Sequence, residues 1–240
     1  MPAELTGAWS ALAATSLPWL TATLLAYLAA DALYRRCGSN PLLHPIVLAV
    51  AMLGGLLWAT GTRYETYFDG AQVLHFLLGP ATVALAVPLH AQLPRLRRML
   101  APLAAGLLAG GVTGIASAVL VAEWLDASAV TRLSLAAKSI TTPVAMGVVS
   151  RLGGYDSLTA VIVVVTGIAG AVMARGLLDA LRVRDEAVRG FAIGIAAHGV
   201  GTARAFQMSE RTGAFAGLAM GLNAVLTALL LPLLWRWLGP

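Results

Sequence analysis

Eight apolar segments separated by short polar connectors make up most of this chain. They lie near residues 17–34, 42–60, 71–90, 100–125, 133–149, 158–181, 190–208 and 215–238. Most approach the roughly 20 residues that a helix needs to cross a bilayer, and none shows the polar alternation typical of barrel strands. The connectors have at most about ten residues, too few for a soluble domain. The pattern predicts an all-α integral membrane protein, a polytopic helical bundle that forms a single membrane domain over residues 1–240.

The composition excludes several other classes of protein. Hydrophobic residues make up 59% of the 240 residues and charged residues only 11%, whereas a soluble domain has about 25% charged residues. The formal net charge is +5, but the arginines lie in the connectors, as the positive-inside rule describes. We therefore expect a lipid bilayer around the chain and no nucleic-acid partner.

The basic connectors predict the orientation of the chain. Basic residues follow the first segment at 35–36, the third at 95–98 and the sixth at 182–189. If these connectors are cytoplasmic, the N-terminus lies outside the cell and segments one to four alternate cleanly. The sixth connector is then cytoplasmic only if the fifth segment enters the membrane and returns to the same side.

Segments 133–149 and 190–208 are the natural candidates for such re-entry, because polar residues and helix breakers interrupt both. Each follows an unbroken span, and the two units would have opposite topologies. This is the inverted repeat of many secondary transporters, in which broken helices meet at the midplane. Residues 1–98 would then be scaffold spans and 99–240 the transport core. Eight full crossings with two unwound helices is the alternative.

The first break carries chemistry suited to an anion. Pro143 removes a backbone donor and ends or kinks the helix, so that the hydroxyls of Ser139, Thr141 and Thr142 and nearby amides can bind a ligand. Lys138 adds a positive charge that would neutralise a carboxylate. The alternative is that Lys138 extends to the interface and the hydroxyls bond to their own helix.

The second break combines glycines with ionisable groups. Gly199 and Gly201 allow unusual backbone conformations and close approach of a ligand, and Thr202 adds a hydroxyl. An unwound turn could bring His198 and Arg204 together, although they lie six residues apart. His198 would then couple proton movement to the substrate, or serve only in packing. Arg204 would bind a carboxylate, or lie at the aqueous mouth paired with a nearby glutamate.

Asn223 completes the candidate substrate-binding residues. It lies on a small-residue face of the last segment, where an interhelical hydrogen bond also explains it. The four histidines are scattered and the single cysteine has no partner at ligand spacing, so we expect no metal site and no cofactor. Because no nucleophile is paired with a base, we expect no enzymatic activity.

Four motifs carry a resemblance to a known family. They lie at residues 78–89, 138–146, 187–204 and 213–220, and they include Lys-Ser-Ile-Thr-Thr-Pro and Ala-His-Gly-Val-Gly-Thr-Ala. By these motifs the chain resembles the LrgB/CidB family, in its YohK-like branch, over roughly residues 20–238. It departs from the pattern at Gly79, where some relatives have an acidic or amide residue, and at residues 155–156, where relatives have Ile-Pro.

The resemblance implies two functions of different classes. Plant chloroplast members transport glycolate and glycerate, and some bacterial members are linked to pyruvate uptake. Other bacterial members are described as antiholin-like regulators of murein hydrolase export and cell lysis, acting with a small holin-like membrane partner. The buried cation and hydroxyls favour a secondary transporter of small monocarboxylates in a bacterial inner membrane. Glycine and alanine pairs on several spans suit a homodimer, and equally suit packing within one chain.

Overall fold

The computed structural model describes residues 16–38, 43, 45–84 and 86–238, and all regular structure in this part of the chain is helical. Four of its helices are long and apolar enough to cross a membrane. They are α2 (Ser16–Arg36), α8 (Leu100–Trp124), α11 (Asp156–Ala180) and α13 (Glu210–Leu238). The prediction of a polytopic helical membrane protein is thereby confirmed. The chain forms two compact units, residues 1–84 and 85–240.

The first unit contains α2, α3 (Pro45–Thr60), α4 (Tyr64–Gly70) and α5 (Gln72–Ala84), with α2 packed against α3 and α4. Trp19 of α2 is buried and meets the ring of Tyr67 edge to face, with 6.0 Å between ring centroids. The indole lies directly against Gly70, where a Cβ would come within 2.4 Å of the ring. Close packing of Trp19 therefore requires glycine at the end of α4.

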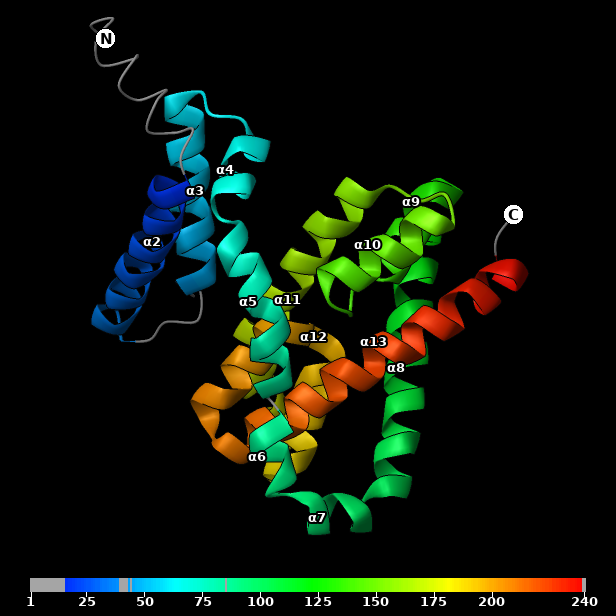
Figure 1. Ribbon diagram of the computed structural model, residues 1–240. Helices are drawn as coiled ribbons and strands as arrows, with labels where there is room; N and C mark the ends of the chain where they lie inside the picture. The colour runs from blue at the N-terminus through cyan, green and yellow to red at the C-terminus, as the bar shows by residue number, and fades with distance from the viewer. Residues whose placement is uncertain (1–15, 39–42, 44, 85, 239–240) are drawn as a thin grey trace, which may run out of the picture. The chain divides into compact units, whose positions relative to one another are not determined.

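The second unit contains α6 (Ala86–His90), α7 (Leu93–Arg98), α8, α9 (Ala129–Ala136), α10 (Thr142–Arg151), α11, α12 (Glu186–Met208) and α13. Its closest helix pair is α12 and α13, which lie together at the centre of the unit (Figure 1). Backbone contact makes this possible, because a Cβ at Gly190 would lie 2.1 Å from the Thr212 carbonyl oxygen.

Two features of the connectors and units differ from the sequence-based expectation. The short helices α4 and α7 lie in connectors that the apolar pattern left without structure. The segment predicted at 71–90 forms α5 and α6, which belong to different units. Because α6 packs against α13, it belongs to the second compact unit, whereas α5 belongs to the first.

The first broken segment is a helical hairpin. Residues 137–141 separate α9 from α10, and these helices have only 8 and 10 residues, too few to cross a bilayer core of about 30 Å. The chain then returns to its own start: the Tyr155 N–H donates to Ser134 Oγ (2.8 Å), and Thr159 Oγ1 donates to the Ser134 carbonyl (3.1 Å). Figure 1 shows α9 and α10 beside one another near the C-terminal end of α8.

The second broken segment also folds back on itself. α12 consists of two helical halves joined at His198, whose backbone has φ 40° and ψ −133°. A Cβ at Gly201 would lie 3.1 Å from the Ile193 carbonyl oxygen, although eight residues of straight helix span about 12 Å. The Arg211–Glu186 ion pair (3.4 Å) joins the start of α13 to the start of α12, so the chain returns to the end from which it entered.

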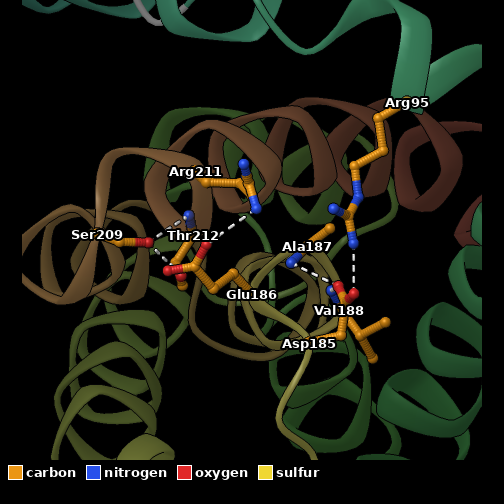
Figure 2. A network of polar contacts seen from close by, with 8 residues as sticks. All are labelled: Arg95, Asp185, Glu186, Ala187, Val188, Ser209, Arg211 and Thr212. Carbon is orange, nitrogen blue, oxygen red and sulfur yellow. Dashed lines mark hydrogen bonds and ion pairs between the residues drawn. The ribbon is translucent and has the colours of Figure 1, made fainter.

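The two hairpins enter the unit from opposite ends of α8. Arg132 in α9 pairs with Glu123 at the C-terminal end of α8 (3.0 Å). The start of α12 instead lies beside α7, which precedes α8, because Arg95 pairs with Asp185 (Figure 2). Asp185 also caps α12 by accepting from the Ala187 N–H (2.9 Å) and the Val188 N–H (3.2 Å).

Charge differs strongly between these two ends. Within residues 86–238, the end that holds α7 and the base of α12 carries nine arginines and four carboxylates, and the other end carries three of each. We call the former the basic end of the second unit. It contains both connectors, 95–98 and 182–189, for which the sequence predicted a common side.

Candidate functional site

Lys138 and Ser139 lie at the tip of the first hairpin. α9 ends at Ala136, and α10 begins at Thr142 with Pro143 in its first turn, where proline costs no helical hydrogen bond. Between them the backbone makes only short turns, such as Lys138 N–H to Leu135 O (3.1 Å). The ammonium group of Lys138 donates to Ser139 Oγ (3.3 Å). Lys138 is the single lysine of the chain, so this tip holds its one primary side-chain amine.

The tip faces a cavity of about 620 Å³. One wall is a face of α8 with small or hydroxyl side chains, and the opposite wall is the first half of α12. The lining from α8 includes Gly106, Gly110, Thr113, Gly114 and Ser117, and that from α12 includes Val188, Phe191, Ala192, Ile195 and Ala196. The cavity is thus mostly apolar, and its polar groups are the hydroxyls of Thr113 and Ser117 on α8 with Lys138 and Ser139 from the hairpin.

His198 lies at the turn of the second hairpin, and its side chain points away from this cavity toward α11. Its Nε2 lies 2.9 Å from the Val163 carbonyl oxygen, so the tautomer with a proton on Nε2 donates to that carbonyl. The ring is buried, and a Cβ at Gly167 would come within 2.6 Å of it. Thr202 is also buried and donates to the His198 carbonyl (2.8 Å). These contacts hold the unusual turn in place.

Asn223 of α13 joins the two hairpins. Its Nδ2 donates to the carbonyl of Ile195, just before the second turn (3.1 Å), and to the carbonyl of Ser139 at the first tip (3.4 Å). The side chain is 1% exposed. A backbone carbonyl beside a break in a helix has no helical N–H group as its donor. The Asn223 amide therefore supplies a hydrogen-bond donor to one such carbonyl at each of the two breaks. The interhelical hydrogen bond that the sequence offered for Asn223 is present.

The predicted site residues therefore fall into three groups. Lys138, Ser139 and Asn223 come together beside the cavity, with half-buried Thr141 and Thr142 and exposed Pro143 following on the same hairpin. His198, Gly201 and Thr202 form the interior of the second hairpin, while Gly199 is exposed. Arg204 lies at the basic end, where its Nη1 donates to Gln207 Oε1 (2.9 Å). The second turn does not bring His198 and Arg204 to a common point.

The α8 wall of the cavity was not among the predicted site residues. From the sequence, the glycines of this helix were expected only to allow close helix packing. They do allow it, because a Cβ at Gly110 would lie 3.0 Å from Ile195. The available signal was the recurrence of glycine and hydroxyl residues every three or four positions from Gly106 to Ser117, which marks one face of a helix. Among the described residues, no group of three His, Cys, Asp or Glu side chains could hold a metal ion.

The fold and the paired hairpins define a multi-pass membrane protein with broken helices at its centre. The model of the LrgB-like family matches residues 23–237, and the chain belongs to this family. The resemblance of the motifs to the LrgB/CidB family is thus confirmed.

Similar proteins cover nearly the same length. The chain is 35% identical over 212 residues to the uncharacterized protein YwbG of Bacillus subtilis, covering 88% of this chain and 94% of the relative. It is 36% identical over 211 residues to YxaC of the same organism (88% and 91%). It is 30% identical over 196 residues to the holin-like protein CidB of Staphylococcus epidermidis (82% and 86%). No solved structure matches the chain.

Proposed function

We propose that this protein is a secondary transporter of small monocarboxylates such as glycolate, glycerate or pyruvate. One observation carries the proposal: the tips of two broken helices converge on the buried amide of Asn223, beside a cavity that presents the chain's single lysine. Broken helices that meet inside a membrane unit supply dipole ends and backbone groups for polar substrates. An ammonium group in an apolar wall is costly unless an anion accompanies it.

The residues at the first tip have distinct roles in this proposal. Lys138 offsets the carboxylate charge, and Ser139 with Thr141 and Thr142 binds the carboxylate and 2-hydroxy or 2-oxo oxygens. The apolar walls from α8 and α12 cover the carbon chain, which needs no polar partner. Binding and release require no covalent step, so we propose transport without enzymatic activity.

We further propose that α8 with the first hairpin and α11 with the second hairpin form an inverted repeat. The opposite entry of the hairpins supports this, as does the Arg95–Asp185 pair, which joins two connectors that must lie on one side of the membrane. With the basic end in the cytoplasm of a bacterial inner membrane, the N-terminus lies outside. Alternating access would then move the hairpin core against the scaffold spans.

The test is uptake of labelled glycolate, glycerate and pyruvate into proteoliposomes. We expect saturable uptake by the wild type and at least a tenfold loss in Lys138→Met, because the ion pair with the substrate is removed. Arg151→Gln is the matched control: it removes a positive charge from the same hairpin, at the exposed end of α10, and should retain uptake. Full activity of Lys138→Met would refute the assigned site.

A labelling experiment tests binding without transport. Apart from the amino terminus, an amine-reactive reagent has only Lys138 as a target, since no other lysine is present. A bound carboxylate should slow modification of Lys138, and acetamide, an uncharged compound of similar size, should not. Equal modification rates in all conditions would contradict carboxylate binding at this tip.

Proton coupling through His198 belongs to the same proposal and has its own test. Uptake should depend on pH in the wild type and lose that dependence in His198→Gln, which can still donate to the Val163 carbonyl. A flat pH profile in both proteins would remove coupling while leaving transport intact.

The second candidate is a holin-like regulator of lysis that acts through a small membrane partner or as a homodimer. The name of the Staphylococcus epidermidis relative favours it. Such a role needs helix-packing surfaces but no cation beside a cavity. Absence of uptake for all three substrates by folded, inserted protein would favour this candidate, and co-purification with the partner would then be the next measurement.

A further inference from the structure

A second depression lies at the basic end, away from the hairpin tips. It has a volume of about 380 Å³ and lies between the end of α11 and both ends of α12. Its lining consists of Arg175, Asp179, Arg189, Arg204, Gln207 and Met208. Three guanidinium groups thus share one small polar space with one carboxylate, a local excess of two positive charges.

The single carboxylate is already engaged by two of these arginines. Asp179 Oδ1 accepts from Arg189 Nη1 (2.7 Å), and Asp179 Oδ2 lies 3.8 Å from Arg175 Nε. The third guanidinium, that of Arg204, donates to the neutral amide of Gln207. Guanidinium groups that line one small depression repel one another, and an anion bound between them lowers this repulsion.

Arg189 is the buried member of the cluster. Its side chain is 14% exposed, and its Nη1 also donates to the Val183 carbonyl (3.2 Å). Its Nε is buried without a hydrogen-bond partner in the described part of the chain. An unsatisfied donor on a buried cation is costly, and an anionic oxygen is the acceptor that would lower this cost most.

We propose that this depression binds a phosphate group, either the phosphodiester of an anionic phospholipid or a soluble phosphate. Guanidinium groups match phosphate oxygens in bidentate geometry. The depression lies where a spanning helix ends, which is the level of the lipid headgroups, and on the basic end. Basic pockets between membrane helices on the cytoplasmic side are typical sites for anionic headgroups.

A neighbouring depression at the same end provides a comparison. It has a similar volume, about 370 Å³, and is lined by Arg95, Arg98 and Arg211. There, Arg95 pairs with Asp185 and Arg211 with Glu186, so two arginines each have a carboxylate of their own, whereas Arg175 and Arg189 share the carboxylate of Asp179. Phosphate should prefer the depression around Arg189. This site does not depend on which substrate is transported.

The experiment measures binding of phosphatidylglycerol to delipidated full-length protein by native mass spectrometry, with phosphatidylcholine as the uncharged-headgroup reference. Inorganic phosphate and glycerol 3-phosphate serve as soluble probes. The variants are Arg204→Gln and Arg175→Gln, both at the rim of the site, and the matched control is exposed Arg98→Gln in the neighbouring depression. Since one arginine near anionic lipid contributes about a fivefold change in affinity, each rim variant should weaken phosphatidylglycerol binding by about that factor, with Arg98→Gln unchanged.

The arms separate the two sources of phosphate. Preference for phosphatidylglycerol over the soluble probes would assign the site to a lipid headgroup, and equally tight binding of inorganic phosphate would assign it to a soluble anion. The proposal is overturned if phosphatidylglycerol and phosphatidylcholine bind alike and phosphate does not bind. It is also overturned if Arg98→Gln weakens binding as much as Arg204→Gln does.

Discussion

Replacing Asn223 by alanine should destabilise the second unit by separating its two hairpins. The change leaves the carbonyls of Ile195 and Ser139 without their shared donor. Ile195 is 7% exposed, so water cannot easily replace the amide, and an unsatisfied buried acceptor costs about 1–3 kcal/mol. The longer bond to Ser139, at 3.4 Å, adds about 0.5 kcal/mol.

Two further effects act in opposite directions. Loss of the amide group leaves a void, which adds about 1 kcal/mol. The variant also removes Asn223 Oδ1, a buried acceptor with no hydrogen-bond partner in the described structure, which returns about 1 kcal/mol. The net loss in free energy of unfolding is therefore about 1.5–3.5 kcal/mol, which corresponds to a fall in Tm of roughly 3–14 °C for a protein of this size.

Thermal unfolding in detergent, followed by circular dichroism, measures this effect. Asn223→Leu keeps the branched shape and fills the void, with a slightly larger side chain, but has no donor, so it should lose nearly as much stability as Asn223→Ala. The matched control is Thr227→Val, a near-isosteric change at a buried position one turn further along α13. A Tm for Asn223→Ala within about 1 °C of the wild type, or an equal fall for Thr227→Val, would falsify the role of Asn223 as the link between hairpins.

Three other changes have expected outcomes. Gly190→Ala places a Cβ 2.1 Å from the Thr212 carbonyl oxygen, where backbone on both sides resists movement, so we expect a loss of about 3 kcal/mol or more and little folded protein in size-exclusion chromatography. His198→Ala and His198→Gly both lose the bond to Val163, but glycine tolerates φ 40°. The glycine variant should therefore be more stable than the alanine variant by about 1 kcal/mol and unfold at a higher temperature. The reverse order would contradict strain at this turn. For Asp185, burial opposes ionisation, but the Val188 and Ala187 N–H groups and the neighbouring arginine outweigh it and hold the carboxyl pKa below its ordinary 3.8. The stabilisation is therefore complete above pH 3.8 and lost as pH falls below it, and Asp185→Asn should flatten the acid limb of a Tm–pH profile.

The sequence by itself determined the helical membrane class and the positions of both interruptions, because these depend on local chemistry. Apolar length fixes which segments suit a bilayer, and Pro143 ends a helix wherever that helix lies. The glycines around His198 likewise mark a turn that needs unusual backbone angles.

Only the tertiary structure decided which side chains meet. Asn223 binds carbonyls that lie 28 and 84 residues away in sequence, and no local pattern encodes those partners. Arg204 and His198 belong to one motif, but His198 lies at the turn of the second hairpin and Arg204 lies near its open end. Arg204 therefore contributes to the basic end instead of the tips. The cavity wall on α8 likewise depends on two helices far apart in the chain facing each other. Periodicity and helix breakers act within a few residues, whereas a site requires long-range packing that brings distant breaks together.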